Sequence, residues 1–321
     1  MIAAISGDRS LKPLIIAIST WIAIFLLFKF FGPIIPEFDA RISTFISATV
    51  LTALSIFIVY GFSSLKLNRT TYLAIGVIAV AGVYLAATPL VKRSKLINSS
   101  GSIPGQIPLL TYQTSTPVIL TEKAILPLRN SIFKELAAFA EASISEPYLM
   151  IIILALAQLA LASGFGLWIA EGIDDITHLI PVALVATIAD IWSVSAGATA
   201  KIVVSSTINY FLLRFPLLAS DSIPYLIGLT DFLFFAIFFQ AAIRYNLGAL
   251  KNAILLAASF VIAIISALFT ATGLPVLPFM AALFVAGNFS KLELKKEELK
   301  QVLIFVIAIL ALFAIFTFML H

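Results

Sequence analysis

Apolar residues fill most of the chain in long runs of about 20 residues, which short polar breaks separate from one another. A run of this length crosses the ~30 Å hydrocarbon core of a bilayer as a helix, and is too long for a barrel strand. The pattern predicts about nine membrane-spanning helices. They cover approximately residues 13–31, 42–62, 70–90, 147–170, 178–198, 223–243, 250–272, 275–289 and 301–320. The eighth is short and begins at two prolines, so we expect a half-helix or a distorted helix there.

One polar interruption is much longer than the others and divides the chain into three parts. Residues 1–90 hold the first three helices, residues 91–146 form a linker, and residues 147–321 hold the other six helices. The linker opens with VKRSKLINSSGSIPGQIP, which is rich in turn-forming residues and predicts irregular chain. It ends with RNSIFKELAAFAEA, where apolar residues at helical spacing alternate with charges. This end predicts an amphipathic helix on the membrane surface.

Composition supports an integral, multi-pass membrane protein. The chain is 61% hydrophobic and 11% charged, whereas soluble domains average about 45–50% apolar and about 25% charged residues. We expect a plasma-membrane location, with the lipid bilayer as a partner. The net charge of +4 is small and indicates loop lysines that set topology rather than nucleic-acid binding. The short-loop charge bias places the N-terminus, Lys66, Arg69 and the Lys291–Lys300 cluster in the cytoplasm.

Several catalytic chemistries lack the residues that they need. The chain has no cysteine and only two histidines, His178 and His321. Thiol nucleophiles and thiolate metal sites are therefore excluded, and a zinc protease of the HExxH type lacks its ligands. A serine–histidine pair would need His178 to reach a buried serine such as Ser163, but His178 lies at a helix start, where an interfacial role is expected. No cofactor and no metal are predicted.

Two aspartates lie deep inside predicted spans, Asp190 in PVALVATIADIWSVSAG and Asp231 in PYLIGLTDFLFFAIFF. A charge at the bilayer centre costs about 2.5–3.5 kcal/mol on insertion scales, so each is a functional candidate. The structural alternative is that each pairs with a backbone group or a lysine. The two spans follow each other closely, so we expect antiparallel neighbours whose carboxyls meet. Such a pair shares a proton, so that one acid and one base can activate water against an amide.

Side-chain size suggests how these two spans pack. Small residues, among them Ala183, Ala186 and Gly228, flank the aspartates and allow close approach of helices. The bulky residues of the second span are predicted to face outward to lipid. They are Phe232, Phe234, Phe235 and Phe238. We expect that removing either carboxylate does not destabilise the fold, because an unpaired charge in lipid is itself costly.

Three motifs in order resemble those of the presenilin and signal peptide peptidase family of intramembrane aspartyl proteases. IADIWSV supplies Asp190, GLTD supplies Asp231, and GLPVLPFMAAL supplies Pro275, Val276 and Leu277. The family has Tyr-Asp, Gly-x-Gly-Asp and Pro-Ala-Leu at these places. Here Ala189 replaces the tyrosine, Thr230 the second glycine and Val276 the alanine, so the chain resembles a divergent member. The resemblance covers about residues 147–290.

The resemblance implies an all-α, presenilin-like helical bundle and an aspartic endopeptidase. Asp190 and Asp231 would be catalytic, and substrates would be transmembrane segments or remnant signal peptides. The substrate-binding residues would be Gly228, Leu229, Thr230, Pro275, Val276 and Leu277. Because prolines interrupt a helix start, we expect the segment 275–277 to lie beside the aspartates and to offer free backbone groups to an extended substrate.

Two other functions remain open on the residues alone. Intramembrane carboxylates also relay protons or bind sodium, so a proton- or ion-coupled secondary transporter is one alternative. It would be expected to line a path with further polar side chains, and these spans offer few at mid-depth beyond Thr187, Ser193 and Thr230. The other alternative is a catalytically inactive presenilin-like protein that binds helices. The separation of the two aspartates discriminates between these functions.

Overall fold

A computed structural model describes residues 11–35, 39–99, 148–195, 208–220, 223–270 and 276–292, with two further positions at 300 and 304. Helices form most of it. The helices are α1 (Lys12–Phe31), α2 (Ala40–Ser64), α3 (Arg69–Ser99), α5 (Tyr148–Glu171), α6 (Leu179–Ser195), α8 (Ile208–Phe211), α9 (Leu229–Arg244), α10 (Ala249–Thr270) and α11 (Leu277–Asn288). Three short 3-10 turns, η2 (Gly32–Ile34), η3 (Ile176–His178) and η4 (Phe289–Lys291), and two strands, β1 (Leu212–Arg214) and β2 (Tyr225–Gly228), complete it.

Within the described residues, five helices are long and apolar enough to cross a membrane. They are Lys12–Ile34, Arg41–Ser64, Arg69–Val91, Tyr148–Glu171 and Ala249–Phe269. A mostly helical, membrane-embedded protein is therefore confirmed, while the prediction of nine spans is not. Helices α6, α9 and α11 have 17, 16 and 12 residues, and a full crossing needs about 20. The ninth prediction, 301–320, lies outside the described residues apart from position 304.

Helix α3 is longer than the sequence pattern predicted. It continues through Pro89 to Ser99, so the expectation of irregular chain from residue 91 onward is wrong for residues 91–99. Pro89 removes a single hydrogen bond, and the buried residues Ala86, Ala87 and Leu90 around it keep the helix packed. The remainder of the 91–146 linker, including its predicted amphipathic helix, lies outside the described residues.

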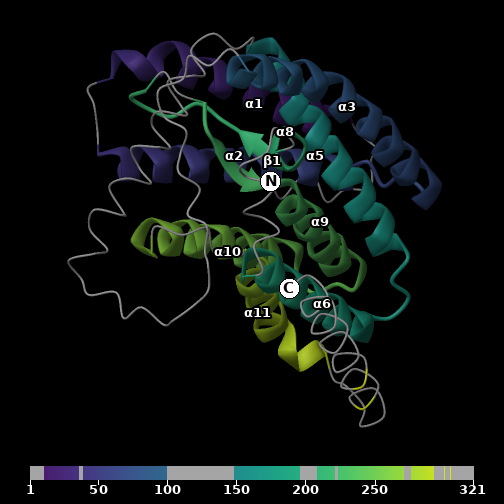
Figure 1. Cartoon of the computed structure of the whole chain (residues 1–321). Coiled ribbons are helices and arrows are strands. Elements are labelled where there is room, and N and C mark those ends of the chain that lie inside the picture. Colours follow the sequence, from purple (N-terminus) through teal and green to yellow (C-terminus); the bar gives the residue numbers. More distant parts are fainter. Residues whose placement is uncertain are drawn as a thin grey trace.

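Small residues bring the central helices close together. Helices α3 and α5 cross at Gly76 and Gly164, where a Cβ added to Gly164 would lie 2.6 Å from the backbone nitrogen of Gly76. Helix α5 meets α9 at Gly166, where a Cβ would lie 2.6 Å from the carbonyl oxygen of Leu233. Such contacts are typical of helix packing in lipid, where close backbone approach replaces the hydrophobic effect. In Figure 1, α5 runs beside both α3 and α9.

Helix α9 lies at the centre of the bundle, packed against α2, α5, α10 and α11. The prediction that its phenylalanines face lipid is therefore wrong for three of the four. Phe232, Phe235 and Phe238 are fully buried. Phe232 stacks on Phe260 of α10 with ring centroids 5.2 Å apart, and Phe238 packs on Phe284 of α11 at 4.8 Å. Protein surrounds this helix, so a bulky apolar face there fills the core.

The predicted span 223–243 begins as a strand and becomes a helix only at Leu229. Strand β2 pairs antiparallel with β1, with Leu212 opposite Gly228. Of these two strands, which Figure 1 draws as arrows, β2 leads directly into α9. Pro224 cannot donate a backbone hydrogen bond, and Gly228 disfavours the helix interior, which explains the late helix start. The fold is thus not purely helical, because a small hairpin is embedded among the helices.

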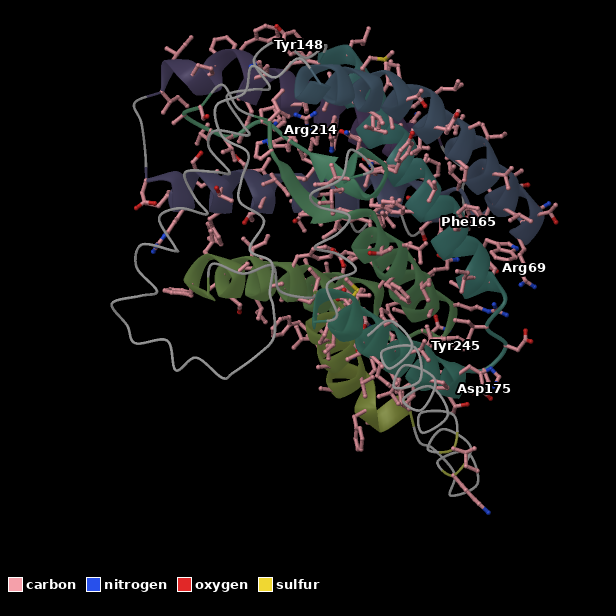
Figure 2. All side chains as sticks on the ribbon, in the orientation of Figure 1. Arg69, Tyr148, Phe165, Asp175, Arg214 and Tyr245 are labelled. Carbon is pink, nitrogen blue, oxygen red and sulfur yellow. The ribbon has the colours of Figure 1, made fainter. Side chains whose placement is uncertain are left out.

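Basic residues gather at one end of the bundle. The guanidinium of Arg69 lies 5.4 Å from the Trp168 ring centroid, and Arg244 donates from Nη1 to the carbonyl oxygen of Glu171 at 2.7 Å. Lys291 reaches the carbonyl oxygen of Asn246, just beyond Arg244. Figure 2 shows Arg69 and Tyr245 near this end and Tyr148 at the opposite one. The charge bias of the short loops predicts that this end faces the cytoplasm.

Candidate functional site

Asp231 lies in the first turn of α9 and is 8% exposed. Gly228 is the N-cap of that helix, and its backbone N–H donates to the Asp231 carboxylate. An acidic side chain that reaches back to the N-cap amide forms half of a capping box and stabilises the helix start. Asp231 also lies about 20 Å along the helix axis from Arg244. This distance places it within the hydrocarbon layer if Arg244 is at the interface.

Asp190 lies on α6 and is half-buried. Its Oδ2 accepts a hydrogen bond from the backbone N–H of Leu277, at 3.1 Å. Leu277 is the first residue of α11, whose N-cap is Val276. Asp190 therefore caps the N-terminus of a neighbouring helix. Both aspartates lie at the positive end of a helix dipole, α9 for one and α11 for the other, and this position favours a carboxylate.

The two carboxyls are close enough for the charge of Asp190 to act on Asp231. In the described part of the chain, however, α6 packs chiefly against α11, while α9 packs chiefly against α5. The expectation that the two aspartate helices pack along each other is therefore wrong. Helix α11 touches both of them, and its N-terminus holds Asp190. The carboxyls are brought together through this third helix, because α9 is already enclosed by its other neighbours.

The remaining predicted site residues fall into two groups. Gly228, Leu229 and Thr230 form the junction between β2 and α9, where Leu229 is buried and Thr230 is exposed. Val276 and Leu277 open α11 beside Asp190, whereas Pro275 lies outside the described residues. The Leu277 amide is bonded to Asp190. The expectation that this segment offers free backbone groups is therefore wrong for the amide of Leu277, while its place beside Asp190 is as expected.

A polar cluster fixes the other end of α9. Gln240 accepts from the Ser63 hydroxyl at 2.6 Å and donates to Glu171 at 2.7 Å. The Tyr245 hydroxyl donates to the carbonyl oxygen of Ile173 at 2.6 Å. Burial raises the pKa of Tyr245 above its ordinary value of 10.0, so this hydroxyl is a donor at neutral pH and at moderately alkaline pH. These bonds join α9 to the ends of α2 and α5, so the helix that carries Asp231 is anchored at both ends.

Sequence reasoning missed Gln158, in the middle of α5. Gln158 is 1% exposed, and its Nε2 donates to the carbonyl oxygens of Asn209 at 3.0 Å and Leu212 at 3.3 Å. The signal was present, because a lone amide stands in the apolar run ILALAQLALAS. A polar side chain at this depth predicts a nearby stretch of irregular backbone whose carbonyl oxygens need a hydrogen-bond donor.

The chemistry available at the site is that of two carboxyl groups enclosed by apolar helices. One can hold a proton while the other is ionised, which provides an acid and a base for the same reaction. Among the described residues, no group of three His, Cys, Asp or Glu side chains is placed to hold a metal ion.

Comparisons with known protein families, with curated proteins and with solved structures found no match. The geometry of the two aspartates and the motifs that contain them are therefore the features that point to a function.

Proposed function

We propose that the protein is an intramembrane aspartic endopeptidase that hydrolyses peptide bonds of transmembrane segments or remnant signal peptides. The observation that supports it is that Asp190 and Asp231 lie close enough inside an apolar bundle for the charge of one to act on the other. Two acids from different helices, each held by a backbone amide, are costly in lipid. Capping of a backbone amide, the structural alternative, accounts for each acid separately, whereas general acid–base catalysis accounts for the two lying together.

The reaction needs only these two groups and water. The ionised carboxyl takes a proton from water, whose oxygen attacks the carbonyl carbon of the scissile bond. The protonated carboxyl gives its proton to the carbonyl oxygen, and a tetrahedral diol results. The C–N bond then breaks as the leaving nitrogen takes a proton from the carboxyl that had received it from water, while one diol hydroxyl gives its proton to the other, ionised carboxyl. The products are a carboxylic acid and an amine, and the two carboxyls again share one proton.

Substrate binding is supported by the strand that leads to Asp231. β2 has one strand partner in the described part of the chain, β1, and ends three residues before Asp231. A transmembrane substrate must unwind before its amide bonds can be attacked, and an unwound chain in lipid needs partners for its backbone groups. Pairing with an exposed strand edge is a general way to supply them. Thr230 is exposed at this junction and would meet the residues beside the scissile bond.

A transition-state mimic tests this proposal. An apolar peptide with a hydroxyethylene group in place of one amide resembles the tetrahedral diol, and its hydroxyl would lie between the two carboxyls. We expect it to bind the purified protein at least about 10²-fold more tightly than the same peptide with a plain methylene group, since transition-state analogues gain this much over ground-state ligands. Isothermal titration in detergent micelles measures both affinities.

The matched control is the Asp231→Asn variant, in which the preference for the hydroxyl should disappear. Equal binding of the two peptides by the unaltered protein would contradict the proposal. In that case a proton-flux assay in liposomes would examine the transporter alternative, because a coupled carrier moves ions without distinguishing the two peptides.

A further inference from the structure

The β1–β2 hairpin is a non-helical segment enclosed by apolar helices. Leu213, Phe215 and Ile227 in it are buried. Irregular backbone at membrane depth is tolerated only when protein or water satisfies its polar groups. The sources of its hydrogen bonds therefore determine how firmly it is held.

Helices α1 and α2 fix the far end of the hairpin. The Ser43 hydroxyl donates to the carbonyl oxygen of Leu218, and the Ser47 hydroxyl accepts from its amide at 3.0 Å. Phe215 inserts among three aromatic rings of α1, with centroid distances between 5.4 and 5.9 Å. These rings belong to Trp21, Phe25 and Phe28. The connection between the strands is thus docked on the N-terminal helices.

Helix α5 fixes the end of the hairpin that lies next to Asp231. Gln158 donates to the carbonyl oxygen of Leu212, and Leu212 is the strand partner of Gly228. The amide of Gly228 in turn holds the Asp231 carboxylate. A continuous path of backbone and side-chain contacts therefore runs from the buried amide of α5 to Asp231.

From this path we propose that Gln158 is a positioning residue, which holds β1 and β2 in register so that Asp231 meets Asp190 in reactive geometry. Gln158 does not touch the reacting atoms and acts through Leu212 and Gly228. The expected effect of Gln158 on turnover rests on the proposed protease function. The expected effect of Gln158 on the order of the hairpin is independent of that function and can be measured separately.

The test uses Gln158→Met, which keeps the unbranched length of the side chain and removes both donors. Hydrogen exchange followed by mass spectrometry should show the amides of residues 212–214 and 225–228 exchanging at least about 10-fold faster, while those of α10 are unchanged. Turnover of a transmembrane substrate should fall at least about 10-fold in kcat with KM within about threefold, because the acid is misplaced while the substrate still binds.

Two further variants distinguish the exact position of the Gln158 amide from the mere presence of a polar group on α5. Gln158→Asn keeps the amide but is one methylene shorter, so its donor falls short and the defect should persist. Ser163→Ala, on the same helix, removes a buried hydroxyl that has no hydrogen-bond partner among the described residues, and should leave exchange and kcat unchanged. If Gln158→Met does not fold, Gln158→Glu replaces it in the test. Glutamate has the same length as glutamine and, when protonated, keeps one hydrogen-bond donor. Its hairpin exchange and kcat should therefore change in the same directions as in Gln158→Met, but by less.

The possible outcomes are distinguishable. Unchanged hairpin exchange in Gln158→Met overturns the inference whether or not the protein cleaves anything. Faster exchange with unaltered kcat overturns the positioning role and leaves only a structural one. If the unaltered protein cleaves no substrate, the proposed function fails, and the exchange data still decide whether Gln158 holds the hairpin.

Discussion

Replacing Asp190 or Asp231 by asparagine should abolish cleavage of a transmembrane substrate. Each variant loses one of the two groups that exchange protons with water and the scissile amide, so we expect kcat to fall at least about 10³-fold. The loss should be the same for both variants and no larger for the double variant, because the two acids act as one unit. Quantifying the cleaved fragments from proteoliposomes at saturating substrate measures it.

Stability separates catalysis from folding in these variants. Asparagine keeps an oxygen that can accept from Gly228 or Leu277, whereas alanine leaves these backbone donors without a partner. We therefore expect Asp→Asn to preserve thermal stability and Asp→Ala to cost about 1 kcal/mol, the usual loss on removing a helix cap. This revises the expectation that either carboxylate could be removed without loss. Turnover retained by either asparagine variant would refute the proposed catalytic pair of Asp190 and Asp231.

Adding one methyl group at Gly228 should also lower activity strongly. A Cβ at this position would lie 3.0 Å from Oδ2 of Asp231, so the carboxylate must move. The backbone of Gly228 has φ −72° and ψ 141°, which alanine adopts without strain. The closest contact of the added methyl group is therefore with the side chain of Asp231, and the Oγ1 of Thr230 lies next, at 3.5 Å. Because a misplacement of about 1 Å can cost about 10²-fold, we expect kcat to fall by about 10- to 100-fold.

The control for Gly228→Ala is Gly82→Ala in α3. There the added Cβ would lie 3.3 Å from the methyl group of Ala157, which is a packing contact remote from both aspartates. Activity should stay within about twofold of the unaltered protein, since the contact disturbs only local packing. Circular dichroism should give equal helix content for both variants. An unaltered kcat in Gly228→Ala would show that Asp231 need not keep its observed position.

The sequence predicted the features that depend on local composition. Long apolar runs indicated the five full-length spans found in the described part of the chain, because crossing lipid requires length and hydrophobicity together. The depth of Asp190 and Asp231 selected them as candidates, because few other ionisable groups lie inside apolar runs. Leu277 was expected near the aspartates on the basis of a motif, and its amide lies 3.1 Å from Asp190.

Features that depend on tertiary surroundings could not be predicted in the same way. Phe232, Phe235 and Phe238 look identical in sequence whether they face lipid or a protein core, since both are apolar. The strand before Leu229 is four residues long, and its partner β1 lies beyond residues 215–224, so no local period indicates the pairing. The role of Gln158 follows only once the hairpin is in place, because its bonding partners come from Asn209 and Leu212.

Hydrolysis in heavy-oxygen water shows whether Asp190 and Asp231 direct water onto an amide bond within a membrane span. The purified protein and its Asp231→Asn variant would be incubated side by side with one transmembrane substrate in H₂¹⁸O, and the fragments weighed by mass spectrometry. We expect the unaltered protein, and not the variant, to give fragments cut within the membrane-spanning segment that carry heavy oxygen in the new carboxyl group. Equal cleavage by both proteins, or no cleavage by the unaltered protein, would contradict it.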